Sequence, residues 1–267
     1  YLIERYRPSE RFLVLTIHTI DLPEVEINAK LDDLFGADPA VYIGLLAEHG
    51  KVDIRLTARG AGEQQLRERL EWFRKQIEGR IGTENIYGIN DETLESAVGR
   101  LLKSRQLTIA VAESCTGGMI ASRLTNMAGA SSYLIEGFVT YSNNAKIERL
   151  GVSAELIERH GAVSRQVAQA MAESVRRLAR ADIGLSATGI AGPTGGTPEK
   201  AVGLVYVGLA WEGGSIAVER RFLGARNENR TYTTNAALDL LRRRLLRQTS
   251  ASSDFGELSR AAKPSTQ

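Results

Sequence analysis

The sequence predicts an α/β protein: a small two-layer α+β domain followed by a larger, layered α/β domain with a central sheet. Strand and helix patterns interleave after residue 91, which is typical of α/β layers. Before that point the order is strand, helix, strand, strand, helix, and a polar, glycine-containing stretch at 82–90 separates the two parts. We therefore expect domains at 1–90 and 91–248, and a disordered tail at 249–267 with few apolar residues.

The elements of the first part follow from the spacing of its apolar residues. Alternation predicts a strand at 11–19, and helical spacing predicts a helix at 27–35. Two alternating segments at 41–46 and 52–57 indicate a hairpin with one solvent-exposed face. A second amphipathic pattern predicts a helix at 66–77.

The second part begins with a helix from residue 91. In its last helix we interpret the run Arg242-Arg243-Arg244, with Arg247, as the solvent-exposed face, and Leu241 and Leu245 as buried beneath it. The expected elements between are strand 107–111, helix 117–127, strand 135–141, helices 144–150, 153–159 and 164–180, strands 182–188, 202–211 and 215–223, and helix 228–247.

Composition and charge narrow the classes of function. A net charge of +2 gives no concentrated basic excess, so we do not expect a nucleic acid partner. No apolar run approaches the roughly 20 residues that span a bilayer, so we expect no membrane association. Cys115 is the only cysteine, which excludes an intramolecular disulfide and fits a reducing cytoplasm; with three scattered histidines we expect no metal site. The chain begins with Tyr1 and no signal-peptide pattern follows, so we expect a segment of a longer chain or a processed one.

The most informative segment follows the first strand of the second part. A polar cluster at 113–116 and two glycines at 117–118 precede an apolar helix start. A strand, a tight turn and a helix start expose a serine hydroxyl and direct the first helical N–H groups toward its surroundings. Ser114 is therefore a candidate nucleophile, although Ser114 or Thr116 could instead cap the helix. Cys115 is a competing nucleophile with a more acidic group.

Tyr141 and Lys146 form a second candidate pair. Tyr141 ends a predicted strand, and Asn143 or Asn144 can cap a helix that holds Lys146 in its first turn. The dipole at that end of the helix and partial burial both lower the pKa of such a lysine, which suits a general base. The alternative is an exposed lysine that forms an ion pair with a nearby glutamate such as Glu148.

A glycine-rich loop at 188–197 follows the strand at 182–188. It has four glycines, one proline and three threonines, and consecutive N–H groups in such a loop form an anion-binding concavity. It matches neither a nucleotide P-loop nor the dinucleotide-binding glycine pattern, and a wide turn between strands is the alternative. The candidate ligand-binding residues in this loop are Thr188, Gly189, Gly192, Gly195 and Gly196.

Arg226 and Arg230 lie four residues apart at the start of the last helix, where both could reach one phosphate. Two solvated arginines on a surface helix are the alternative. The string GRIG at 79–82 matches the G-x-x-G of an RNA-binding loop, but no helix follows it immediately, so we do not assign it that role.

Four strings resemble the C-terminal domain of the competence/damage-inducible CinA family. They are VAESCTGG (111–118), TYSNNAK (140–146), HGAVS (160–164) and ATGIAGPTGGTPEK (187–200), and the resemblance spans residues 91–248. Residues 1–90 resemble the KH-like middle domain of full-length CinA proteins. Those proteins usually begin with a molybdopterin-binding-like domain credited with ADP-ribose pyrophosphatase activity, which has no counterpart in this sequence, so we do not expect that activity.

The family includes nicotinamide-nucleotide amidohydrolases. The resemblance therefore implies hydrolysis of the carboxamide of nicotinamide mononucleotide (NMN), giving nicotinate mononucleotide and ammonia, with no metal or cofactor. It assigns the nucleophile to Ser114, the base to Lys146 and a proton-relaying phenol to Tyr141. It also implies that the glycine-rich loop and the two late arginines bind the substrate: Thr188, Gly189, Gly192, Gly195, Gly196, Arg226 and Arg230. From the turn itself we add Thr116, Gly117 and Gly118 to the substrate-binding set, since the helix start offers N–H donors and its glycines let a ligand approach the backbone closely.

Two details of this assignment concern backbone geometry. The N–H groups of Thr116 or Gly117 would stabilise the oxyanion that forms on the carboxamide. The sequence departs from the family at Ala201, where a proline usually follows the lysine, and this puts the rigidity of the loop's exit in doubt.

We expect a small-molecule nucleotide as partner, a cytoplasmic location, a role in pyridine nucleotide recycling and a homodimer, since exposed strand edges often pair. Two alternatives differ in class. A regulatory module would bind a nucleotide without turnover, and calorimetric binding without ammonia release would support it. A protein acting on RNA through residues 1–90 would bind RNA with a steep salt dependence.

Overall fold

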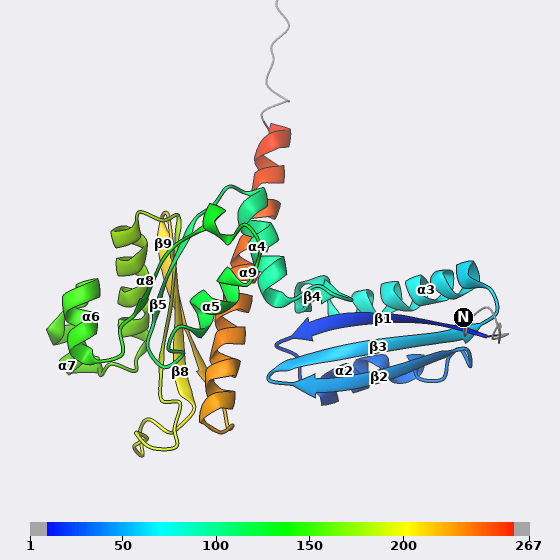
Figure 1. Cartoon of the computed structure of the whole chain (residues 1–267), viewed down its shortest axis with the longest axis horizontal. Helices are drawn as coiled ribbons and strands as arrows, with labels where there is room; N and C mark the ends of the chain where they lie inside the picture. Colours follow the sequence, from blue (N-terminus) through cyan, green and yellow to red (C-terminus); the bar gives the residue numbers. More distant parts are fainter. Residues whose placement is uncertain (1–9, 259–267) are drawn as a thin grey trace, which may run out of the picture. The chain divides into compact units, whose positions relative to one another are not determined.

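The structure is a computed structural model that describes residues 10–258, with the side chains of residues 10–247. It divides into two compact units, Tyr1–Leu94 and Glu95–Gln267, and each has its own sheet (Figure 1). The predicted fold class is confirmed: a small α+β domain precedes a larger α/β domain with a central mixed sheet.

The first unit is a four-stranded antiparallel sheet with two helices packed on it. Its elements are β1 (Arg11–Ile20), α2 (Glu24–Leu31), η1 (Asp32–Leu34), β2 (Val41–Glu48), β3 (Lys51–Gly60), α3 (Glu63–Ile81), η2 (Thr83–Asn85) and β4 (Ile86–Ile89). The strand order is β2-β3-β1-β4. Alternate residues such as Ile54 and Leu56 of β3 face Leu70 and Phe73 of α3 in a single core, as the hairpin and helix patterns predicted.

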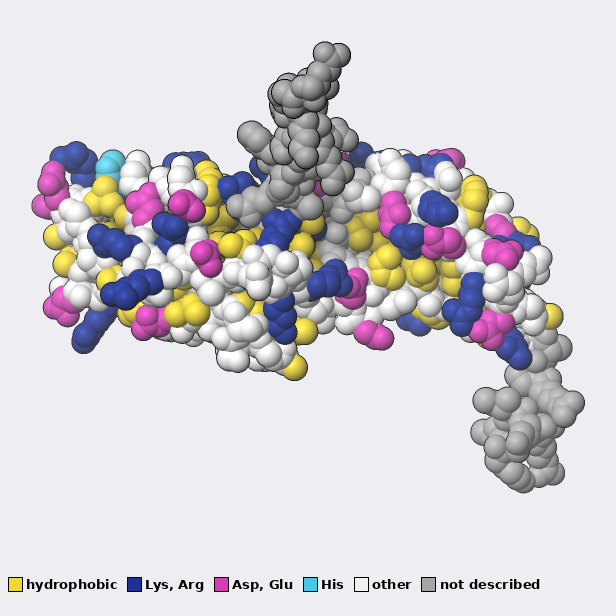
Figure 2. Space-filling model, turned by 90° about the horizontal axis from the view of Figure 1, so that it is seen from above, with side chains coloured by type: hydrophobic (Ala, Val, Ile, Leu, Met, Phe, Trp, Pro, Cys, Tyr) yellow, Lys and Arg dark blue, Asp and Glu magenta, His cyan; other side chains and the backbone are white. Residues whose placement is uncertain are grey.

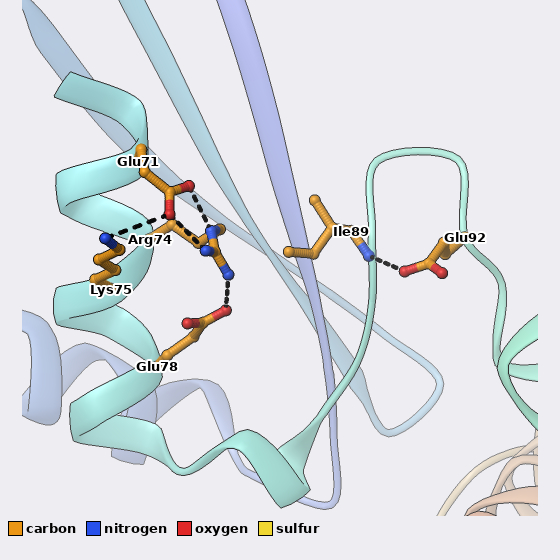
Figure 3. A network of polar contacts seen from close by, with 6 residues as sticks. All are labelled: Glu71, Arg74, Lys75, Glu78, Ile89 and Glu92. Atoms are coloured by element: carbon orange, nitrogen blue, oxygen red, sulfur yellow. Dashed lines mark hydrogen bonds and ion pairs between the residues drawn. The ribbon is translucent and has the colours of Figure 1, made fainter. Parts of the chain in front are cut away.

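The predicted connection at 82–90 contains a strand that the sequence analysis missed. β4 pairs antiparallel with β1, and Ile89 lies opposite Ile17. Four residues give too little alternation to be recognised as a strand. Just beyond β4, the Glu92 carboxylate accepts a hydrogen bond from the Ile89 N–H at 3.1 Å, which closes a turn (Figure 3).

The outer face of α3 carries a chain of charged side chains. Arg74 donates hydrogen bonds to Glu71 and Glu78, and Lys75 lies 3.9 Å from Glu71 (Figure 3). Ion pairs near the surface stabilise a protein by about 0–1 kcal/mol each, so burial of the apolar face contributes more to holding the helix in place.

The second unit is built on a five-stranded mixed sheet. Its elements are α4 (Leu94–Ser104), β5 (Ile109–Glu113), α5 (Met119–Thr125), η3 (Ala130–Ser132), β6 (Leu134–Val139), α6 (Asn143–Leu150), α7 (Ala154–His160), α8 (Arg165–Ala179), β7 (Ile183–Gly189), β8 (Leu204–Trp211), β9 (Gly214–Arg221) and α9 (Arg226–Leu258). The strand order is β6-β5-β7-β8-β9. β5 is parallel to both of its neighbours, whereas β8 and β9 are antiparallel to the strands beside them.

Helices cover both faces of this sheet (Figure 1). On one face, α8 packs so closely that a Cβ at Gly184 would lie 2.0 Å from the Ala172 carbonyl oxygen, and one at Gly208 would lie 2.3 Å from that of Ala168. Glycine is therefore required at both positions. On the other face, α5 and α9 lie side by side against the strands.

The last helix differs from its prediction in two ways. α9 continues to Leu258, into the segment we expected to be disordered, and residues 259–267 lie outside the described residues. Leu241 and Leu245 are buried as predicted, but Arg242 is also buried and donates to Asp239, so its assignment to a solvent-exposed face is wrong. Helical spacing alone does not show that a buried carboxylate one turn earlier accepts the guanidinium.

The face of the molecule seen in Figure 2 shows no dominant charge. On the face seen in Figure 2, Lys and Arg side chains are interspersed with Asp and Glu side chains rather than gathered into one basic patch. Among the described residues, no helix combines the length and apolar character needed to cross a membrane.

Candidate active site

Three of the sequence motifs meet at one edge of the second sheet. β6, β5 and β7 are parallel neighbours, and Glu113 lies level with Val139 on one side and Ala187 on the other. The turn with Ser114, the start of α6 and the glycine-rich loop therefore leave the sheet side by side. In open α/β sheets, ligands bind at this carboxyl edge.

Ser114 lies in the turn between β5 and α5. All five residues of β5 are buried, and Ser114 itself is 8% exposed. Its N–H donates to the Ala187 carbonyl at 2.9 Å, which extends the pairing with β7 by one residue and fixes the start of the turn. The serine hydroxyl is thus held at the carboxyl edge of a rigid strand.

Glu113 caps α5, a role that the sequence analysis assigned to Ser114 or Thr116 as the alternative to catalysis. Its buried carboxylate accepts hydrogen bonds from the N–H groups of Gly118 at 2.9 Å, Ile120 at 3.2 Å and Ala121 at 2.9 Å. These contacts satisfy the first N–H groups of the helix. A carboxylate at the end of an otherwise apolar strand was the signal that could have indicated this cap.

Lys146 is buried in the first turn of α6 and is 1% exposed, so the alternative of an exposed, ion-paired lysine is wrong. The cap of α6 is Ser142, whose Oγ accepts from the Ala145 N–H at 3.0 Å, rather than either predicted asparagine. Lys146 Nζ lies 3.1 Å from Ser114 Oγ, 2.9 Å from the Thr140 carbonyl oxygen and 3.3 Å from that of Tyr141.

These contacts fit a neutral amine. Burial lowers the pKa of Lys146 because the charged form loses its hydration, and the structure pairs it with no carboxylate among the described residues. A neutral amine has two N–H donors and one lone pair. Two carbonyls can take the donors, which leaves the lone pair for the hydroxyl proton of Ser114.

Cys115 lies beside Ser114 but is chemically different. The side chain is buried, and burial raises the pKa of its thiol to about 12. The thiol therefore stays protonated near neutral pH, and a protonated thiol is a poor nucleophile.

The phenol of Tyr141 does not join the serine and the lysine. The side chain is 61% exposed, and its Oη accepts a hydrogen bond from Arg226 Nη2 at 3.0 Å. Arg226 Nη1 also donates to the Gly192 carbonyl at 2.7 Å. Tyr141 reaches Lys146 only through its main-chain carbonyl, and Arg226 links the tyrosine to the glycine-rich loop.

A pocket of about 300 Å³ opens beside Ser114 and contains many of the predicted residues. Asn143, Ala162 and Val163 also line it, and the sequence analysis gave them no such role. The predicted residues that line the pocket are Ser114, Tyr141, Lys146, Thr188, Gly189, Gly192, Gly195 and Arg226. Those that do not are Thr116, Gly117, Gly118, Gly196 and Arg230.

Arg230 holds the serine turn rather than reaching the pocket together with Arg226. Its Nη2 donates to the Thr116 carbonyl at 3.0 Å. The Gly117 N–H donates to the Ser114 carbonyl at 3.1 Å inside the turn, so it is not free to stabilise an oxyanion. Of the two predicted oxyanion donors, the Thr116 N–H is the one that forms no such backbone hydrogen bond within the turn.

Side chains tie the glycine-rich loop to its surroundings. Lys200 Nζ donates to the carbonyls of His160 and Val163 at 2.7 Å each. Thr188 Oγ1 donates to the Ala162 carbonyl at 2.9 Å. The two bonds of Lys200 thus tie the loop's exit, next to Ala201, to the end of α7 and the segment between α7 and α8.

The site offers nothing typical of a metal centre. Within the described part of the chain, no three His, Cys, Asp or Glu side chains gather as metal ligands.

Comparison with known proteins identifies the family. Residues 91–245 match the model of the CinA C-terminal domain, and residues 15–88 match that of the damage-inducible protein CinA KH domain. The chain belongs to the CinA family. The resemblance seen in the sequence is thereby confirmed for both parts of the chain.

Relatives of the CinA family share much of this chain. A putative competence-damage inducible protein of Thermoanaerobacter pseudethanolicus is 46% identical over 246 residues, covering 92% of this chain and 59% of the relative. One of Halothermothrix orenii is 43% identical over 231 residues, with coverage of 86% and 55%. A CinA-like protein of Kosmotoga olearia is 48% identical over 231 residues. The chain thus spans little more than half the length of these relatives.

Solved structures of the family match a little more than half of this chain. The competence/damage inducible protein CihA from Agrobacterium tumefaciens is 42% identical, with a TM-score of 0.55, covering 55% of this chain and 91% of that one. A CinA superfamily protein from Klebsiella pneumoniae is 33% identical, with a TM-score of 0.56, covering 58% and 96%.

Proposed function

We propose that this chain is an amidohydrolase that converts NMN to nicotinate mononucleotide and ammonia. The observation that carries the proposal is the 3.1 Å contact between Lys146 Nζ and Ser114 Oγ at the wall of a pocket. The family resemblance supplies the substrate class. The lack of a histidine beside either residue leaves the lysine as the base.

The reaction begins when Lys146 takes the proton of the Ser114 hydroxyl. Ser114 Oγ then bonds to the carboxamide carbon, and the carbonyl oxygen becomes an oxyanion. When the tetrahedral intermediate collapses, the C–N bond breaks and Lys146 returns the proton to the departing ammonia. A water molecule then attacks the acyl carbon while Lys146 accepts one of its protons. When this second tetrahedral intermediate collapses, the bond from the acyl carbon to Ser114 Oγ breaks and Lys146 returns the proton to Ser114 Oγ. The acid product loses its proton to solvent and leaves as the carboxylate.

The oxyanion needs hydrogen-bond donors because a carboxamide is a poor electrophile. We assign one of them to the Thr116 N–H, since that of Gly117 is bonded within the turn. Removing one such donor typically lowers the rate by about 100- to 1,000-fold.

Arg226 is the candidate for binding the phosphate of the nucleotide. Its guanidinium has five N–H donors, and the bonds to Gly192 and Tyr141 leave others for an anion. The N–H groups of the glycine-rich loop would bind the same end of the ligand. Arg230 and Gly117 would act indirectly, by fixing the turn that carries Ser114.

Four further expectations belong to this proposal. They are the domain division at residues 1–90 and 91–248, a homodimer, a cytoplasmic location and a role in recycling pyridine nucleotides. Sedimentation of the purified chain tests the dimer, and limited proteolysis tests the division near residue 90.

An ammonia-release assay tests the activity. We expect the chain to release ammonia from NMN, more slowly from nicotinamide riboside, which lacks the phosphate, and more slowly still from nicotinamide. The matched control is Ser114→Ala, which should lower ammonia release by about 10⁴-fold or more. Calorimetric binding of NMN without ammonia release by the unaltered chain would overturn the proposal in favour of a regulatory nucleotide-binding module.

A further inference from the structure

Most polar side chains that line the pocket are already engaged within the protein. Seven side chains with an oxygen or nitrogen line it, and five form hydrogen bonds to other protein groups. The five are Ser114, Lys146, Tyr141, Thr188 and Arg226. The other two, Asn143 and Thr194, have no side-chain partner in the part of the chain that the structure describes.

The side chain of Asn143 does not cap α6, although its position at the start of the helix suggests that role. It begins α6, where an asparagine often caps the helix, but Ser142 already accepts the Ala145 N–H at 3.0 Å. The next residue, Asn144, donates to Glu148 at 3.1 Å and does not line the pocket. The amide of Asn143 is therefore free for a ligand.

Asn143 lines the same pocket as the reacting side chains, Ser114 and Lys146. It lies three residues before Lys146, and residues three apart in a helix share a face. Lys146 in turn contacts Ser114 at 3.1 Å. Thr194, by contrast, lies in the glycine-rich loop and not on a helix.

We propose that Asn143 binds the carboxamide of the substrate and holds it beside Ser114. This inference rests on the proposed amidohydrolase function. A side-chain amide is complementary to a carboxamide because each offers one acceptor and two donors. Asn143 Oδ1 accepts a hydrogen bond from the substrate NH₂ group, which leaves the substrate carbonyl oxygen for the oxyanion donors. Asn143 thereby selects carboxamide substrates and orients the bond that breaks.

A binding cycle tests the contact itself. In a Ser114→Ala background, which prevents turnover, calorimetry compares NMN with the pyridine ribonucleotide that lacks the carboxamide. Asn143→Leu should weaken the binding of NMN about tenfold and leave the binding of the truncated nucleotide unchanged, since one neutral hydrogen bond is lost. Asn144→Leu is the matched control, because it alters the neighbouring asparagine, which is also exposed but does not line the pocket.

Kinetics with Ser114 present provide the second measurement. Asn143→Leu should lower kcat/KM for NMN by about tenfold or more, whereas Asn144→Leu should change it by less than about twofold. Equal losses of affinity for both nucleotides, or equal kinetics for the two variants, would overturn the inference and leave the proposed function intact. If the unaltered chain releases no ammonia from NMN, the proposed function itself fails.

Discussion

Replacing Lys146 with methionine tests the proposed base most directly. Methionine keeps most of the length of the side chain but removes the amine that lies 3.1 Å from Ser114 Oγ. General-base catalysis contributes about 10²- to 10⁴-fold to a rate, so kcat/KM for ammonia release should fall by about 100-fold or more. Initial rates with NMN over a range of concentrations measure this loss.

The same replacement should change folding stability little, because two effects oppose each other. The carbonyls of Thr140 and Tyr141 lose donors at 2.9 and 3.3 Å, at about 1 kcal/mol each. Burial of the amine, which lowers its pKa, carries a desolvation cost that methionine does not have. We therefore expect the melting temperature to change by at most about 8 °C, so lost activity cannot be attributed to unfolding.

The pH profile separates a base from a structural lysine. Because burial lowers the pKa of Lys146, the neutral amine forms below the ordinary value of 10.5, and kcat/KM should rise with pH along an acid limb below that value. The unfolded chain binds this proton more tightly, so stability should also rise as pH increases from the lowered pKa toward 10.5. Lys146→Met should abolish both the acid limb of kcat/KM and the rise of stability with pH. A variant that kept the acid limb, or more than about a third of kcat/KM, would refute the reasoning.

Four other substitutions distinguish the roles of neighbouring residues. Ser114→Ala should lower ammonia release by about 10⁴-fold or more but cost only about 1 kcal/mol of stability; a rate within tenfold of the original would exclude Ser114 as the nucleophile. Cys115→Ala should keep kcat/KM within about threefold of the original value. Iodoacetamide at neutral pH should not inactivate the unaltered chain, because burial raises the pKa of the Cys115 thiol to about 12 and keeps it protonated. Rapid inactivation by iodoacetamide would contradict this. Glu113→Gln should lower the free energy of unfolding in urea by about 1–3 kcal/mol, because an amide accepts the three N–H hydrogen bonds at the start of α5 less well than a carboxylate does. An unchanged midpoint of urea unfolding would show that Glu113 does not stabilise α5 as a cap. Tyr141→Phe keeps the main-chain carbonyl that contacts Lys146 and should lower kcat/KM by less than about tenfold. A 100-fold loss would instead show that the Tyr141 phenol takes part in proton transfer.

Hydrophobic spacing was sufficient to predict most of the fold. The hairpin, the amphipathic helices and the two buried strands that lead into the site, β5 and β7, each repeat a pattern long enough to be recognised. β4 was missed because four residues hold no clear period. Arg242 was misassigned because hydrophobic spacing places a charged residue on the exposed face of a helix. It does not show that the carboxylate of Asp239, one turn earlier in α9, is itself buried and accepts the guanidinium.

The site could be predicted in its residue types but not in all of its contacts. The serine turn, the lysine and the glycine-rich loop are unusual local sequences, so each was a candidate by itself. Some donors have partners that are distant in the sequence, and local patterns do not indicate these: Arg230 is 114 residues from the Thr116 carbonyl that it binds. Asn143 was overlooked because an asparagine beside a helix start normally suggests a cap, and only the contact of Ser142 shows that the amide is free.

The partners of Lys146 explain how a lysine can serve as a base in this fold. A carboxylate next to the amine would favour the charged form and raise its pKa, whereas the carbonyls of Thr140 and Tyr141 satisfy its N–H groups without adding a negative charge. Both carbonyls belong to the segment that leaves β6, so the backbone that ends the strand also orients the base. The protonation state of Lys146 therefore depends on main-chain geometry and burial, and the Tyr141 side chain is free to contact Arg226 at the pocket.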